Sequence, residues 1–157
     1  MKKTLAVLIV SILFGLTTSP TNALAAWRRQ HGSTCFQQNN LNASFYNETT
    51  GLINNTGFQQ TFICPYADDS FLPRTNVWTL NLHGQKNTPS GQDSAFACVK
   101  NWGWYGFQCG IGTTVTTNAP WAMALFADYW RSFPADFAYI KVTLQPGSGI
   151  FGFFVSE

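Results

Sequence analysis

The chain has 157 residues, of which 10% are charged and 16% aromatic, and its formal net charge at pH 7 is +2. This length fits one domain, and the many Phe and Trp residues exclude a disordered protein. The positive excess comes from Lys2 and Lys3, so the remainder is neutral and lacks the basic footprint of nucleic-acid binding. We therefore expect no nucleic-acid partner.

The first 25 residues have the three parts of a secretory signal peptide. Two lysines form a positive start, an apolar run follows over residues 5–16, and Ala23-Leu24-Ala25 is a small-x-small cleavage motif. The apolar run is too short to cross a bilayer, which takes about 20 residues, and no later segment is long and apolar enough. The sequence predicts cleavage after Ala25, a secreted or periplasmic protein, and a single mature domain over residues 26–157.

The mature part contains four cysteines, an even number that predicts two disulfides in an oxidising compartment. A zinc site is disfavoured because no two cysteines have a Cys-x-x-Cys spacing and neither histidine stands at ligand spacing from a thiol. Four cysteines allow three connectivities. A glycine-punctuated segment that can turn the chain back lies between Cys98 and Cys109, so we favour that pair, which leaves Cys35–Cys64.

Most of the mature sequence alternates between apolar and polar residues with a period of two, which indicates β-strands. In residues 77–83 we expect Trp78 on the same face as the leucines, and in 58–64 we expect Phe58 beside Phe62, with Gln60 as an exception on that face. The strands expected from the pattern are Leu41–Tyr46, Gly51–Asn54, Phe58–Cys64, Val77–His83, Ala95–Lys100, Thr113–Thr117, Trp121–Phe126, Phe137–Leu144 and Ile150–Val155.

Short strands separated by turn-rich pieces predict an all-β fold, an antiparallel β-sandwich of about 8–9 strands stapled by two disulfides. Residues 122–131 suit either a short helix or a strand followed by a loop. We favour the strand and loop, because the segment is rich in aromatic residues.

Few residues could carry catalysis. We expect Arg28-Arg29 to be a solvated end and His31 to lie in the same polar N-terminal stretch, whereas His83 ends a strand on its polar face. Except for Asp93 and Asp128, the acids stand beside turn residues or at a terminus, which disfavours a catalytic carboxylate pair. Adjacent Asp68-Asp69 fall short of a calcium-binding loop. We therefore expect no enzyme, no catalytic residues, no metal and no cofactor.

The most distinctive segment is Asn101-Trp102-Gly103-Trp104-Tyr105-Gly106-Phe107. Rings at a loop tip can stack on the C–H faces of sugars, but aromatic residues fill cores more often. Two interpretations follow: the rings close one end of the sandwich, which we favour, or Trp102, Trp104 and Tyr105 form a carbohydrate-binding platform. The same weighing applies to Trp121, Tyr129 and Trp130.

The sequence also contains Gly51-Leu-Ile-Asn54, then Cys64-Pro65, two further cysteines, and a closing Tyr139-Ile140 followed by Gly152 and Glu157. This pattern resembles small exported bacterial proteins, many of them uncharacterised, and it covers most of the chain from Cys35 onward. The resemblance implies a disulfide-stapled β-sandwich and supplies no activity or ligand. We expect an exported, non-catalytic protein with a structural or binding role, whose candidate partners are a glycan or another envelope protein.

Overall fold

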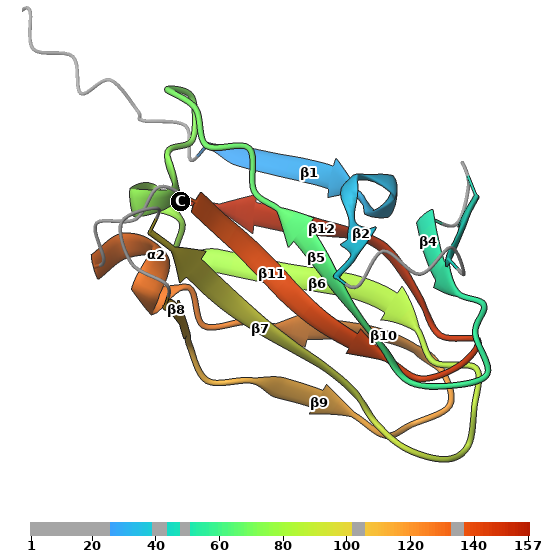
Figure 1. Ribbon diagram of the computed structural model, residues 1–157. Helices are drawn as coiled ribbons and strands as arrows, with labels where there is room; N and C mark the ends of the chain where they lie inside the picture. The colour runs from blue at the N-terminus through green and yellow to red at the C-terminus, as the bar shows by residue number, and fades with distance from the viewer. Residues whose placement is uncertain (1–25, 39–43, 48–50, 102–105, 133–136) are drawn as a thin grey trace, which may run out of the picture.

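The computed structural model describes residues 26–38, 44–47, 51–101, 106–132 and 137–157. Within them, two six-stranded sheets of antiparallel strands pack face to face, as Figure 1 shows. This confirms the all-β antiparallel sandwich. All nine expected strands are present, and the short strands at residues 27–31, 36–37 and 107–109 are additional.

We call the first sheet sheet A. Its strands are β1 (Trp27–His31), β3 (Ser44–Asn47), β4 (Gly51–Asn54), β6 (Thr79–Gln85), β10 (Pro120–Ala124) and β12 (Gly149–Ser156). The order is β10-β6-β12-β4-β3. One edge of β12 pairs with β6. Along its opposite edge, the beginning of β12 pairs with β4 and the rest pairs with β1. The last strand of the chain is thus the one that joins three others.

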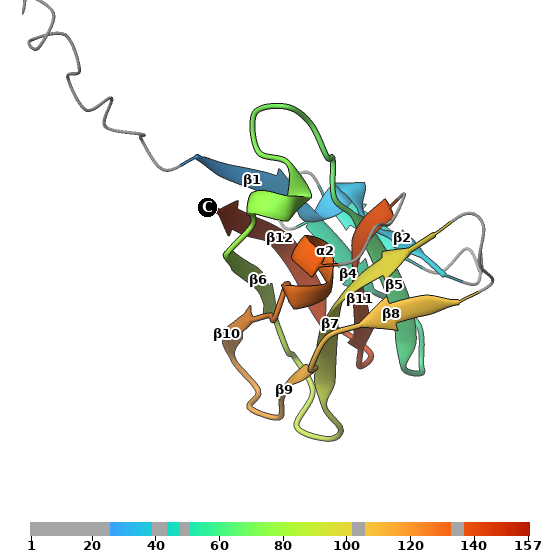
Figure 2. The ribbon, with the colours of Figure 1, turned by 90° about the vertical axis from the view of Figure 1, so that its left-hand side faces the viewer.

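The second sheet, sheet B, has the order β2-β5-β11-β7-β8, and β9 also pairs with β7. Its strands are β2 (Phe36–Gln37), β5 (Gln60–Pro65), β7 (Asp93–Lys100), β8 (Phe107–Cys109), β9 (Thr113–Val115) and β11 (Phe137–Leu144). Three short helices are 3-10 helix η1 (Gly32–Thr34), 3-10 helix η2 (Arg74–Asn76) and α2 (Asp128–Ser132). Figure 2 looks onto the end of the sandwich where α2 lies. For residues 122–131, the expected strand and loop extend only to Ala127, and a helical turn follows.

The core between the sheets follows the period-two pattern. In β11, alternate residues from Ala138 to Leu144 are buried and the others face outward. Trp121 and Trp130 are also buried. The Trp130 ring lies 5.0 Å from the Tyr66 ring, and its Nε1 donates to the Cys98 carbonyl at 2.9 Å. The burial of both rings confirms the interpretation of Trp121 and Trp130 as core residues, and the bonded N–H fixes the orientation of the Trp130 indole.

Two expected facings are wrong. Trp78 is 69% exposed, because β6 begins only at Thr79 and Val77 fills the core instead. Phe58 lies before β5 and is exposed, whereas Gln60 turns inward. The Gln60 Oε1 accepts a hydrogen bond from the Gln37 Nε2 at 2.8 Å, so this buried acceptor has a partner inside the sandwich.

Both expected disulfides are confirmed. Cys98 and Cys109 face each other on β7 and β8, and the bridge ties this hairpin together. The bridge from Cys35 to Cys64 ties the segment between η1 and β2 to β5. In the part of the chain that the structure describes, no helix has the length and hydropathy to cross a membrane.

Candidate functional site

An open hollow of about 690 Å³ lies on the solvent face of sheet A. Small-molecule sites usually measure about 300–1,000 Å³, so the hollow is large enough to hold a ligand. Its walls come from β1, β6 and β12, and its lining residues are Arg29, Gln30, His31, His83, Phe151, Gly152, Phe153 and Phe154.

Strand register brings the two histidines of the sequence to this hollow. His31 on β1 is paired with Gly152 on β12, and Gly152 is paired in turn with His83 on β6. Both imidazoles are on exposed residues of the outer face, separated by a residue that has no side chain. In the next row Arg29 is paired with Phe154. The side chains of Arg29, His31 and His83 therefore surround the backbone at Gly152, which no side chain covers.

A β-bulge in β12 shapes the floor of the hollow. The register of β12 against β6 shifts between Ile150 and Gly152, and the inserted Phe151 turns outward, where it is 36% exposed. A Cβ at Gly152 would lie 2.3 Å from the Gln30 carbonyl oxygen, and one at Gly32 would lie 2.2 Å from the Ile150 carbonyl oxygen. Glycine at both positions therefore lets β1 and η1 approach the bulge.

The hollow contains hydrogen-bond donors on its histidine and arginine side chains. The Ser33 N–H donates to Nδ1 of His31 at 3.2 Å, which leaves Nε2 as the protonated nitrogen of a neutral ring. The Arg29 guanidinium carbon lies 5.6 Å from the Trp27 ring centroid, a cation–π contact that fixes its position. The six strands of sheet A contain no Asp or Glu. The hollow thus offers N–H donors and positive charge beside aromatic walls.

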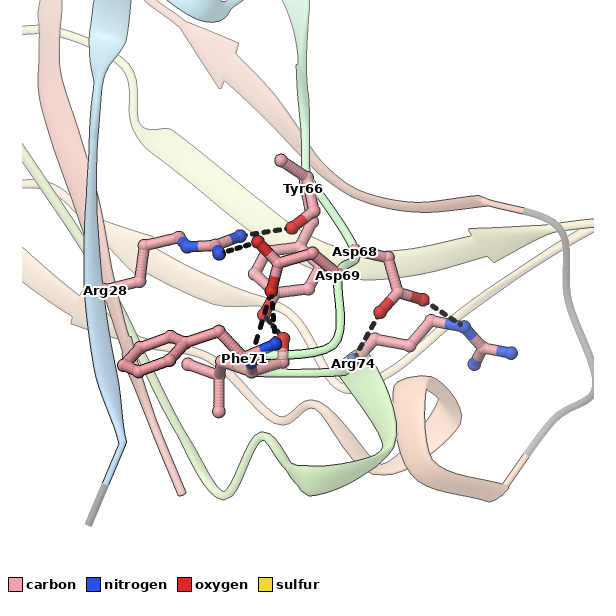
Figure 3. Close-up of polar contacts among 8 residues, drawn as sticks. Arg28, Tyr66, Asp68, Asp69, Phe71 and Arg74 are labelled. Atoms are coloured by element: carbon pink, nitrogen blue, oxygen red, sulfur yellow. Dashed lines mark hydrogen bonds and ion pairs between the residues drawn. The ribbon is translucent and has the colours of Figure 1, made fainter. Parts of the chain in front are cut away.

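The expectation of a solvated N-terminal end is wrong. Residues 27–31 form β1, and Arg28 points to the opposite side from Arg29, where it donates to the Ala67 carbonyl and pairs with Asp69 (Figure 3). The sequence of this segment contained a sign of the strand. Its residues alternate between two faces, with Trp27, Arg29 and His31 on one face and Arg28 and Gln30 on the other.

Asp68 and Asp69 fix the loop between β5 and β6. The Oδ1 of Asp69 accepts hydrogen bonds from the N–H groups of Phe71 at 2.9 Å and Leu72 at 3.0 Å, as Figure 3 shows. The Leu72 N–H bond and the Arg28 guanidinium hold the pKa of Asp69 below its usual range. Asp68 accepts from the Arg74 N–H at 2.9 Å and pairs with its Nε at 3.4 Å. These carboxylates are occupied by donors, and among the described residues no three His, Cys, Asp or Glu are placed to hold a metal ion.

Tyr66 anchors the start of the same loop. Its hydroxyl donates to the Leu72 carbonyl, and burial raises its pKa to about 12. The hydroxyl therefore stays protonated at neutral pH and acts as a structural donor.

A second polar cluster is closed to solvent. Three polar residues are fully buried where β6 ends and where β7 and β12 begin: Lys86, Asp93 and Ser148. Burial raises the pKa of Asp93, against the opposing effects of the Gln145 N–H at 2.8 Å, Ser148, Trp121 and Lys86. The burial of Lys86 has no signal in the sequence, since its neighbours are polar turn residues.

The aromatic platform predicted from the sequence, Trp102, Trp104 and Tyr105, lies outside the described residues. The flanking strands are described: Lys100 is paired with Phe107, and the Lys141 ammonium lies 5.4 Å from the Phe107 ring centroid. Phe107 is 56% exposed. An exposed aromatic ring thus lies on β8, at the described end of this segment.

A comparison with protein-family models, curated proteins and solved structures finds no match. The resemblance to small exported bacterial proteins stays a prediction. The function has to be inferred from the geometry of the chain itself.

Proposed function

We propose that the protein is an exported, non-catalytic binding protein whose ligand site is the hollow on sheet A. The observation that carries the proposal is the convergence of Arg29, His31 and His83 on the bare backbone at Gly152, next to the exposed Phe151 ring. A concave surface with aromatic walls and a few convergent polar groups is the usual form of a ligand site.

Two features support the export and the non-catalytic role. Two disulfides suit an oxidising compartment, secreted or periplasmic, and they fit the predicted signal peptide that ends at Ala25. The described aspartates are engaged elsewhere: three pair with arginines and Asp93 is buried. The Ser33 hydroxyl lies 2.9 Å from Nδ1 of His31, but no Asp or Glu is among the residues that line the hollow to complete a catalytic set with them.

A second candidate function is carbohydrate binding by the loop that contains Trp102, Trp104 and Tyr105. The favouring observation is the disulfide at the base of the loop, together with the exposed Phe107 beside it. A short loop held at both ends loses little entropy when its rings stack on a sugar.

A glycan array probed with the mature protein, residues 26–157, tests the proposal. We compare the wild type with Phe151→Ser, which removes an aromatic wall of the hollow, and with Phe126→Ser, which removes an exposed aromatic ring outside the hollow. Loss of array signal in Phe151→Ser alone supports the hollow. Loss only in a Trp102→Ala/Trp104→Ala double variant moves the site to the loop, and a wild type without any signal contradicts glycan binding at either place.

A further inference from the structure

The hollow combines features that select a particular ligand chemistry. From its donors, its unpaired charge and its shape, we propose that it binds a saccharide that carries a carboxylate, such as a hexuronate unit of an acidic polysaccharide. This inference rests on the proposed function and names the ligand class of the same site.

Arg29 is the cation available to such a ligand. Arg28, Arg74 and Arg131 each pair with an aspartate, whereas Arg29 has no ion pair within the described residues and is held by the Trp27 ring instead. A guanidinium matches a carboxylate with two parallel hydrogen bonds. The free charge at the edge of the hollow therefore favours a carboxylate over a neutral group.

The two histidines and the lack of acidic residues in the strands of sheet A also favour an anionic ligand. His31 directs a protonated Nε2 outward, because its Nδ1 is occupied by Ser33. His83 is on the opposite side of Gly152, and no Asp or Glu occurs in any strand of sheet A to compete for the donors or repel an anion. Acceptor-rich ligands, such as acidic sugars with their carboxylate and hydroxyl oxygens, complement this set.

The aromatic walls and the open shape favour a saccharide over a compact aromatic acid. Phe151 and Phe154 line the hollow, and their rings suit the apolar C–H face of a pyranose. Sites for compact ligands enclose most of the ligand surface, whereas this hollow lies open along the outer face of β1, β12 and β6. A chain of sugar units can enter and leave such a surface at both ends.

The test is an NMR titration of the ¹⁵N-labelled mature protein with tetragalacturonic acid. The chain has two histidines, both in the hollow, so the imidazole spectrum contains two ring systems and each reports on this site. The fully methyl-esterified tetramer is the matched probe without charge. We expect the acid to shift both ring systems and to bind at least tenfold more tightly than the ester.

Two charge variants complete the design. Arg29→Gln removes the proposed carboxylate partner, and Lys100→Gln removes one exposed charge on sheet B. We expect at least a tenfold loss of affinity in the first variant and less than a twofold loss in the second, with unchanged thermal melts in both. Equal losses in the two variants, or equal affinity for acid and ester, overturn carboxylate recognition while leaving the hollow as a binding site. No shift of either ring system overturns the inference, and the array then decides separately whether the hollow binds any glycan.

Discussion

Asn54 is the residue whose replacement tests the description of the sandwich most directly. Its side chain is fully buried at the end of β4. Its Nδ2 donates to the carbonyls of Phe58 and Leu144, each at 3.0 Å, and its Oδ1 accepts from the N–H of Thr56 at 3.1 Å and from the Thr56 hydroxyl at 2.7 Å. One amide thus holds the turn before β5 and reaches across to β11 in the other sheet.

We predict that Asn54→Ala lowers the free energy of unfolding by about 3 kcal/mol. A hydrogen bond contributes about 1 kcal/mol net, and a buried group left without a partner costs about 1–3 kcal/mol. The bond to Leu144 is buried, so its loss is uncompensated, whereas water reaches Thr56 and recovers part of the loss there. A domain of ordinary stability, about 5–15 kcal/mol, still folds after this loss.

Urea unfolding of the mature protein with intact disulfides, followed by tryptophan fluorescence, measures the effect. Asn55→Ala is the matched control, because Asn55 is the adjacent residue of the same type and is exposed. We expect the control to change the free energy of unfolding by less than about 0.5 kcal/mol. A loss below about 1 kcal/mol in Asn54→Ala, or equal losses in both variants, would refute the assignment of these bonds.

Four further predictions concern charge, packing, bridging and processing. Burial raises the pKa of Asp93, so the contribution of its protonated carboxyl to stability is complete below the usual carboxyl pKa of about 3.9 and is lost as pH rises through the higher folded-state pKa. In urea unfolding at pH 4 and pH 7, the wild type should therefore lose stability relative to Asp93→Asn. A difference between the two proteins that stays constant with pH contradicts this. Trp130→Ala should cost about 3–5 kcal/mol in the same assay, through the cavity it leaves under Tyr66. Replacing Cys35 and Cys64 together by Ala should cost about 2–5 kcal/mol, and a melt matching the wild type would disprove it. Intact-mass analysis of the exported protein should show Ala26 as the first residue; a mass that retains residues 1–25 excludes cleavage.

The local sequence pattern predicted most of the strands, because the alternation of buried and exposed residues in a strand depends on neighbouring residues. The alternation in residues 137–144 predicted the buried face of β11, and the glycine-punctuated sequence between Cys98 and Cys109 predicted their pairing. The pattern failed where the exact start of a strand decides whether a side chain points into the core or to solvent. Trp78 precedes β6 by one residue, and its side chain is exposed to solvent. A two-residue strand such as β2 has no periodicity to detect.

The candidate site could not be predicted from the sequence, because it depends on register between distant strands. His31, His83 and Gly152 meet only when β1 and β6 pair with opposite edges of β12. In the sequence, neither histidine lies near the other or near Gly152. The bulge at Phe151 is equally non-local, since it forms where β12 exchanges β4 for β1 as its neighbour.

The position of β12 in sheet A has a consequence for the order in which the molecule is built. The strand that joins β1, β4 and β6 comes after all of them in the chain, and residues 26 and 157 meet through a hydrogen bond of 3.0 Å. Until β12 emerges, β1 has no partner among the described strands and β6 has only β10. Contacts of such long sequence separation form slowly. Sheet A therefore lacks the strand that joins its parts until β12 has been synthesised, although every strand of sheet B precedes β12 in the chain.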